Sequence, residues 1–272
     1  MEPMDLHTHS NMSDGTCTPS LLVEKAKAAG LGILALTDHD CIQGIPEAME
    51  AGERLGIRVI PGLELDTEFH TELHMLGLGV DPQHPALQEF AARNAQRRQA
   101  RNEAILNQLA AAGVDVRPFF PAQHGTPTRL HVALALVAGG FAPTIGEAFR
   151  NYLFRGTPGY VETKRILPED AIALIHQAGG LAVLAHPCKV KADVAALVAR
   201  LHPAGLDGLE AFYPTATPGQ RDTYISMAQQ YGMLLTCGSD FHGDNRPDNR
   251  LGCTWQQSPL LEPVYTWLLQ RS

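Results

Sequence analysis

The stretch that decides the fold reads Met-Asp-Leu-His-Thr-His-Ser at residues 4–10, with Asp14 shortly after it. We expect a short strand here. Residues two apart in an extended chain point to the same side, so His7 and His9 present two imidazoles on one face. That pair suits a divalent metal ion that accepts nitrogen ligands, such as zinc, manganese or iron. Two ordinary surface histidines would give the same pattern, so the metal hypothesis requires further ligands from the rest of the chain.

Composition limits the class of protein. With 272 residues, 44% of them hydrophobic, the chain is long enough for one large α/β domain, or for one with an insertion. No apolar run approaches the length that spans a bilayer, and no secretory signal is evident. We therefore expect no membrane contacts, and the cysteines predict a cytoplasmic location. A disulfide framework is not expected, because the five cysteines are odd in number and lack C-x-x-C spacing.

The net charge of −8 argues against broad, non-specific binding of nucleic acid, which needs a basic surface. We expect no stable nucleic-acid complex. A small phosphorylated substrate remains compatible with this charge, because metal cations held by acidic residues attract phosphate locally.

Strands and helices alternate in two parts of the chain. Seven segments read as strands, and several run from apolar residues into ligand-type residues: 4–10, 32–40, 57–66, 72–80, 181–187, 208–212 and 233–242. Helical spacing falls between most of them, at about 18–30, 46–55, 168–178, 191–201 and 218–231. This alternation is typical of an α/β fold of the β/α-barrel type.

Residues 81–167 lack this alternation. Helical spacing covers about 86–112, 128–138 and 144–152, and the first of these helices repeats arginine every four residues at Arg93, Arg97 and Arg101. We expect a barrel domain at 1–80 and 168–272, with a helical insertion at 81–167 that caps the barrel mouth and carries substrate recognition. For the arginine stripe, a solvated helix face is the preferred interpretation.

Residues able to bind metals gather at the strand ends. In a parallel barrel the carboxyl ends of all strands open onto one face, so these side chains should converge. We predict a site for two or three metal ions built from a subset of His7, His9, Asp14, Asp38, His39, Glu64, His74, His186, Asp240 and His242.

Four short motifs among these residues resemble those of the PHP (polymerase and histidinol phosphatase) family. They are His7-Thr8-His9, Thr37-Asp38-His39, Ala185-His186-Pro187 and Ser239-Asp240-Phe241-His242. The resemblance implies a distorted seven-stranded (β/α)7 barrel, phosphoester hydrolysis, and a trinuclear site that usually holds manganese, iron or zinc. It also implies how the ligands divide: His7, His9, Glu64 and Asp240 for one metal, Glu64, His74 and His186 for a second, and Asp14, His39 and His242 for a third. Asp38 either binds metal or orients a histidine.

The mechanism that follows is in-line attack on the phosphorus by a hydroxide that bridges two metal ions. We expect Asp240 to be a proton acceptor, with Asp240 or His242 protonating the leaving alkoxide.

The insertion supplies candidates for binding the substrate. In the segment Pro-Thr-Arg-Leu-His at residues 127–131, Thr128 can cap a helix and Arg129 can reach a phosphate bidentately. We predict substrate contacts for Arg129 and Lys164, whereas His131 fits either a core position or a substrate contact.

The layout of D-L-H-x-H-S-x-x-S-D-G, P-T-R-x-H and G-S-D-F-H resembles one subgroup of the family, the 3′,5′-nucleoside bisphosphate phosphatases. This implies removal of the 3′-phosphate from adenosine 3′,5′-bisphosphate or a similar nucleotide. The alternatives are a 5′→3′ exonuclease on short RNA, a histidinol-phosphate-type monoesterase, and a non-catalytic module of the same family.

Overall fold

The computed structural model describes residues 1–120, 125 and 127–270, and the chain divides into two compact units. One unit comprises residues 1–91 and 165–272, and the other comprises residues 92–164. The first division falls inside a helix, α3 (Pro85–Ala111), and not at residues 80 and 81. The first turns of that helix stay with the first unit because Leu87 and Phe90 are buried in its hydrophobic core.

The first unit contains a seven-stranded sheet whose strands follow chain order. At the end of the first strand, Thr8 bridges Phe241 in parallel, and the His9 N–H donates to the Phe241 carbonyl at 2.9 Å. These contacts join the first strand to the last and curl the sheet into a nearly closed barrel. The predicted distorted seven-stranded barrel is confirmed, with its strands at β1 (Met4–Thr8), β2 (Ile33–Leu36), β3 (Arg58–Asp66), β4 (His74–Leu78), β5 (Leu181–Leu184), β6 (Gly208–Phe212) and β7 (Leu234–Cys237).

Strand β4 runs against its neighbours. It pairs antiparallel with both β3 and β5, whereas the other neighbouring strands pair in parallel. Residues 67–73 are too few for the crossover that a parallel pair needs, so β3 and β4 form a hairpin. The prediction that every ligand residue sits at the carboxyl end of a parallel strand is therefore wrong for His74. It is the first residue of β4, and the reversed direction brings it beside Asp66 at the end of β3.

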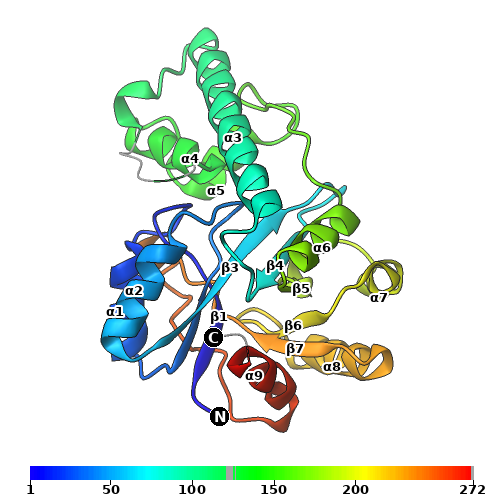
Figure 1. The fold of residues 1–272 in the computed structure, drawn as a ribbon. Helices are drawn as coiled ribbons and strands as arrows, with labels where there is room; N and C mark the ends of the chain where they lie inside the picture. The colour runs from blue at the N-terminus through cyan, green and yellow to red at the C-terminus, as the bar shows by residue number, and fades with distance from the viewer. Residues whose placement is uncertain (121–124, 126, 271–272) are drawn as a thin grey trace. The chain divides into compact units, whose positions relative to one another are not determined.

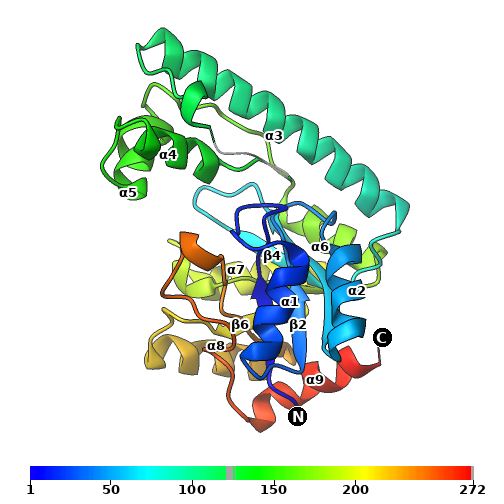
Figure 2. The same ribbon diagram turned by 90° about the vertical axis from the view of Figure 1, so that its left-hand side faces the viewer.

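Helices lie on the outer side of the strands, as Figures 1 and 2 show. They are α1 (Pro19–Ala28), α2 (Ile45–Leu55), α6 (Pro168–Gln177), α7 (Val194–Leu201), α8 (Pro218–Tyr231) and α9 (Glu262–Leu269). Helix α9 was not predicted from the sequence; it is short, and its Val264 and Leu268 are fully buried in the core of the unit. None of the helices in the described part of the chain contains an apolar stretch of the length needed to span a bilayer.

The second unit is helical and has its own small core. It contains most of α3, together with α4 (Arg129–Ala138), α5 (Ile145–Ala148) and a π-helical turn at Phe149–Leu153. The side chains that fill this core include Ile105, Leu109, Val132, Leu136 and Leu153.

The solvated interpretation of the arginine stripe is wrong for Arg101. This side chain is buried, and its guanidinium donates to Asn102 Oδ1 at 2.9 Å and to the Pro127 carbonyl at 3.4 Å. Asn102 in turn donates to the Thr128 carbonyl at 3.3 Å. Arg101 therefore helps to hold the start of α4 against α3.

Candidate metal centre

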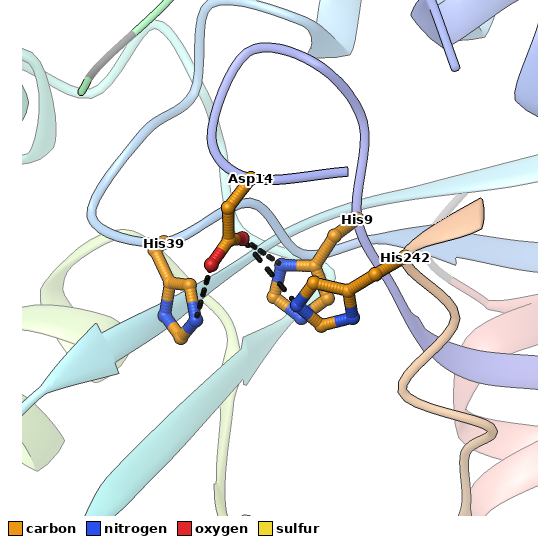
Figure 3. Close-up of side chains that lie close together, drawn as sticks. All are labelled: His9, Asp14, His39 and His242. Atoms are coloured by element: carbon orange, nitrogen blue, oxygen red, sulfur yellow. Dashed lines mark ion pairs between the residues drawn. The ribbon is translucent and has the colours of Figure 1, made fainter. Parts of the chain in front are cut away.

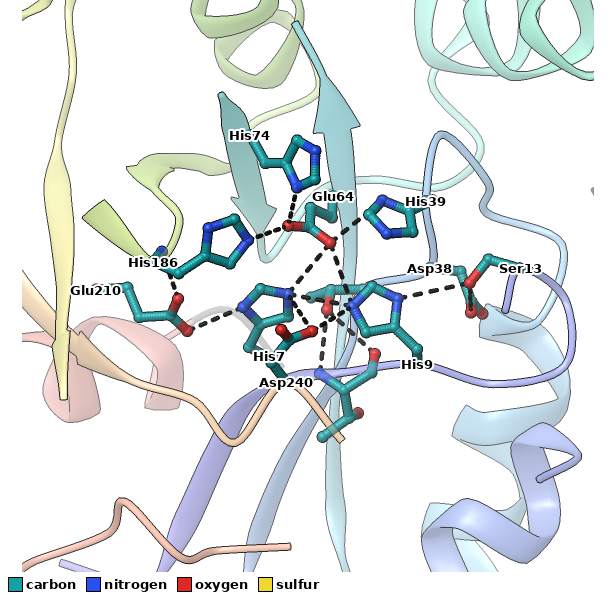
Figure 4. Close-up of polar contacts among 12 residues, drawn as sticks. His7, His9, Ser13, Asp38, His39, Glu64, His74, His186, Glu210 and Asp240 are labelled. Carbon is teal, nitrogen blue, oxygen red and sulfur yellow. Dashed lines mark hydrogen bonds and ion pairs between the residues drawn. The ribbon is translucent and has the colours of Figure 1, made fainter. Parts of the chain in front are cut away.

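Imidazoles and carboxylates from distant parts of the chain converge at one end of the barrel (Figure 4). Three overlapping groups each offer ligand atoms within 4.8 Å of one another. The groups are His7, His9, Glu64 and Asp240, then His9, Asp14, His39 and His242, and finally His39, Glu64 and His74. His9, His39 and Glu64 each belong to two groups, so the three positions share ligands.

The first group combines β1 with β3 and the segment after β7. His7 Nε2 lies 3.1 Å from His9 Nε2, and Glu64 Oε2 lies 3.3 Å and 3.2 Å from these two nitrogens. Asp240 Oδ1 approaches the same two nitrogens to 3.6 Å and 3.4 Å. The strand periodicity of 2 places both imidazoles on one face, as the sequence analysis expected.

The second group gathers three imidazoles around Asp14, which lies on the loop that follows β1 (Figure 3). Asp14 Oδ1 lies 3.4 Å from His242 Nε2 and 3.9 Å from His9 Nδ1, and Asp14 Oδ2 lies 3.9 Å from His39 Nε2. The structure thus brings together the three residues that the family resemblance assigns to one metal, and adds His9 to them.

Glu64 is the centre of the third group. Its Oε1 accepts hydrogen bonds from His74 Nδ1 at 2.7 Å and from His186 Nε2 at 2.8 Å, while Oε2 lies 3.2 Å from His39 Nδ1. The family resemblance assigns Glu64, His74 and His186 to one metal, and His186 does contact Glu64. The group of ligand atoms within 4.8 Å of one another, however, contains His39 in place of His186.

Several buried polar atoms of this cluster fit metal binding because the protein itself does not satisfy them. Asp14 Oδ1, Asp240 Oδ1, His39 Nδ1 and His242 Nε2 are buried without a hydrogen-bond partner among the described residues. Leaving such an atom unsatisfied costs about 1–3 kcal/mol. A divalent cation bound between them would remove this cost, and mixed imidazole and carboxylate ligands suit zinc, manganese and iron.

The electrostatics keep the carboxylates ready to bind a cation. Burial raises the pKa of Glu64, but the imidazoles of His39, His7 and His74 outweigh it and hold the pKa well below its usual range. Burial likewise raises the pKa of Asp240, and Arg246 and neighbouring histidines reverse the shift. Burial lowers the pKa of His39 to about 4, and this shift favours the form of the ring that offers a lone pair to a metal.

Glu210 is a buried residue of the site that the sequence analysis missed. His7 Nδ1–H donates to Glu210 Oε1 at 2.9 Å, and the His186 N–H donates to Oε2 at 2.7 Å. The first bond fixes the tautomer of His7 so that Nε2 faces the metal position. Gly238 makes room for this contact, since a Cβ there would lie 2.3 Å from both Glu210 Oε1 and His7 Cβ. A glutamate in the middle of an otherwise apolar strand was the available signal.

Asp38 holds the loop between His9 and Asp14. It accepts hydrogen bonds from the Ser10 N–H at 2.8 Å, the Ser10 hydroxyl at 2.6 Å and the Ser13 hydroxyl at 2.6 Å. Among the described residues it joins none of the three metal-binding groups. Of the two roles considered for Asp38, this geometry favours orientation of its neighbours.

The second carboxylate oxygen of Asp240 is surrounded by donors. Tyr213 donates to Oδ2 at 2.7 Å, Lys189 Nζ lies 3.0 Å away, and Arg246 Nη1 is also hydrogen-bonded to it. Asp240 has a φ of 54° and His186 a φ of 28°, a region that non-glycine residues rarely occupy. The surrounding hydrogen bonds therefore hold both residues in strained backbone conformations that aim their side chains.

The predicted substrate-binding residues all lie in the second unit. Thr128 caps α4 by accepting the Leu130 N–H at 3.2 Å, and His131 Nδ1 accepts the Thr128 N–H at 3.0 Å, which completes a capping box. His131 thus has a structural role in its own helix. Arg129 is partly buried and Lys164 is exposed. Substrate contacts by Arg129, Lys164 and His131 stay a prediction.

Comparison with known proteins places the chain among phosphoesterases. A family model for the PHP domain matches residues 5–185. The 5′-3′ exoribonuclease Rnm of Salmonella typhimurium is 39% identical over 249 residues, which cover 88% of this chain and 84% of that protein. The 3′,5′-nucleoside bisphosphate phosphatase of Chromobacterium violaceum is 33% identical over 280 residues, covering 100% of this chain and 98% of that protein. A solved structure from Bifidobacterium adolescentis, described as a metal-dependent phosphoesterase, superposes with a TM-score of 0.83 at 29% identity and covers 100% of this chain and 98% of that one.

Proposed function

The chain belongs to the PHP domain family, and we propose that it is a metal-dependent phosphatase that removes the 3′-phosphate from nucleoside 3′,5′-bisphosphates. The observation that carries the proposal is the set of overlapping groups around Glu64, His9 and His39. The relative named as a bisphosphate phosphatase aligns with this chain over its whole length, including residues 92–164.

Hydrolysis of a phosphate ester requires positive charge beside the phosphoryl oxygens, and this site could supply it by binding metal cations. Metal ions held by the three groups would neutralise the phosphoryl oxygens and activate water as the nucleophile. We propose two or three ions, manganese first and iron or zinc as alternatives. His7, His9, Glu64, His74 and the other ligands hold them, and Glu210 and Asp38 keep those ligands in place.

The protein's own hydrogen bonds bear on how the leaving alkoxide is protonated. Asp240 Oδ2 accepts from Tyr213, Lys189 and Arg246, so it has no proton to donate. His242 Nδ1–H donates to the Asp240 carbonyl at 2.8 Å, and its Nε2 faces Asp14. Both residues also belong to the groups that could hold a metal, so they would serve as metal ligands in the proposed enzyme. We infer that the leaving alkoxide takes its proton from water.

Incubation of the manganese-loaded protein with adenosine 3′,5′-bisphosphate tests the proposal. We expect release of inorganic phosphate and accumulation of the 5′-monophosphate. A phosphate assay measures the first product, and chromatography of the nucleotide identifies the second. Turnover of histidinol phosphate without release from the bisphosphate would show that the substrate is a different monoester.

A 5′→3′ exoribonuclease is the second candidate, favoured by the higher identity to the Salmonella enzyme. It predicts stepwise release of mononucleotides from a short 5′-phosphorylated RNA. Measuring kcat/KM for that RNA and for the bisphosphate in one preparation decides between the two. A non-catalytic module would bind no more than one metal per chain, which elemental analysis measures directly.

A further inference from the structure

We propose that Lys189 and Arg246 form an anion subsite beside the metal centre, which binds a phosphoryl group of the substrate or the inorganic phosphate released from it. The ligand in either case is a phosphate dianion. The proposal rests on the proposed function only in requiring that the substrate carry phosphate.

The two cations come from separate segments and meet at one atom. Lys189 ends the turn Pro187–Lys189 that follows β5, and Arg246 follows the turn Gly243–Asn245 beyond β7. Both contact Asp240 Oδ2, Lys189 Nζ at 3.0 Å and Arg246 Nη1 by a hydrogen bond. Among the described residues, Asp240 is the only carboxylate ion-paired with either cation.

This oxygen receives more positive charge than one aspartate balances. Tyr213 already donates to Oδ2 at 2.7 Å, and the other oxygen, Oδ1, faces His7 and His9 in the first metal-binding group. If Oδ1 bound a divalent cation, the single negative charge of Asp240 would be shared with that cation. Asp14 and Glu64, the other carboxylates that act on Arg246, also belong to the metal-binding groups and would be shared in the same way. Lys189 and Arg246 would then lack a full counter-charge and lie close to ions of the same sign. A bound phosphate dianion would restore the balance.

The two cationic side chains differ from the tyrosine in their exposure to solvent. The side chains of Lys189 and Arg246 are 30% and 36% exposed, whereas Asp240 and Tyr213 are each 1% exposed. Part of each cationic side chain is therefore accessible to a ligand from solvent, whereas the carboxylate and the tyrosine are not. Lys189 Nζ also lies 4.8 Å from the centre of the Tyr213 ring, a cation–π contact that restrains the ammonium group. The arginine fork suits bidentate binding of phosphoryl oxygens.

The competing explanation is that both cations merely position Asp240. Tyr213 distinguishes the two roles because it donates to the same oxygen but carries no charge. Positioning predicts that Tyr213→Phe behaves like Lys189→Gln and Arg246→Gln. An anion subsite predicts that loss of either cation weakens phosphate binding, while loss of the tyrosine hydroxyl does not.

The experiment is calorimetric titration of the manganese-loaded full chain with inorganic phosphate, with metal content measured on the same samples. We expect Lys189→Gln and Arg246→Gln each to weaken phosphate binding by about tenfold, the loss of one charge-assisted hydrogen bond, at unchanged metal content. Arg246→Lys should retain most of the affinity because it keeps the charge, and Tyr213→Phe should retain all of it. Circular dichroism melts verify that each variant is folded.

The proposal is overturned if both glutamine variants bind phosphate as tightly as the parent. It is also overturned if Lys189→Gln and Arg246→Gln lose metal together with Tyr213→Phe, because the cations would then act only through Asp240. Phosphate binding does not depend on which ester is hydrolysed. Failure to turn over a nucleoside bisphosphate would therefore count against the proposed function and leave the anion subsite standing.

Discussion

Histidines lie beside polar groups in two regions: the end of the barrel that carries the candidate metal ligands, and the first turn of α4 in the second unit. Their roles differ between these regions. At the barrel end, His7, His9 and His39 lie at or just beyond strand ends, where their backbones contact Asp240, Phe241 and Glu64 of neighbouring segments. Their rings therefore face one another and Glu64. In α4, the unpaired N–H groups of the helix start are close by, and His131 is taken up in capping them. The same residue type thus contributes to a candidate metal centre in one place and stabilises a helix in the other.

The sharpest test of this contrast is Glu64→Gln. Because Glu64 contacts imidazoles from all three metal groups, we expect metal content to fall and kcat/KM to drop by at least about a thousandfold. Elemental analysis and phosphate-release kinetics measure both effects. His131→Gln serves as the control in the second unit and should retain full metal content. Unchanged metal content in Glu64→Gln would contradict its central place.

Removal of the metal should affect the two regions unequally. Metal bound only to the native state stabilises the region that holds it. Treatment with a chelator is therefore expected to accelerate amide exchange about a hundredfold at residues 7–9 and 240–242, with no change in α4. Hydrogen-exchange mass spectrometry follows both segments in one sample. Equal acceleration in both regions would mean that the metals support the whole chain and not the barrel alone.

Glu210→Gln tests the hydrogen bonds behind the ligands. The amide NH₂ cannot accept the His186 N–H in place of Oε2, and loss of such a partner typically lowers metal affinity about 10–100-fold. Competition with a chromogenic chelator measures the affinity. Asp207→Asn is the matched control, because Asp207 pairs with His176 and the Ala182 N–H away from the metal centre. The role assigned to Glu210 fails if both variants bind metal as the parent does.

The smallest effect is expected from His131→Ala. Loss of the capping interaction should destabilise the second unit by about 1 kcal/mol, measured by urea unfolding. A structural role predicts an unchanged KM once the protein is folded. A KM that rises tenfold without loss of stability would show that His131 contacts the substrate, and would remove the contrast between the two regions.

The sequence was most informative where its hydrophobic periodicity is compatible with only one type of secondary structure. The apolar runs located all seven strands, and the i, i+2 spacing placed His7 and His9 on one face before any partner was known. Helix α9 escaped because no strand–helix alternation marks it. Arg101 was misplaced because a four-residue spacing describes a helix face without saying what covers that face.

Only the tertiary structure decided how distant segments pair with one another. The sequence itself determined the strands, the helical insertion and the ligand-type residues, because these depend on local conformation and hydrophobic pattern. The reversed direction of β4, the sharing of His9 between two metal groups and the bond from His7 to Glu210 depend on contacts made when the barrel closes. An imidazole and a carboxylate 203 residues apart carry no local signal of each other. Their geometry exists only once the sheet has brought β1 and β6 into place.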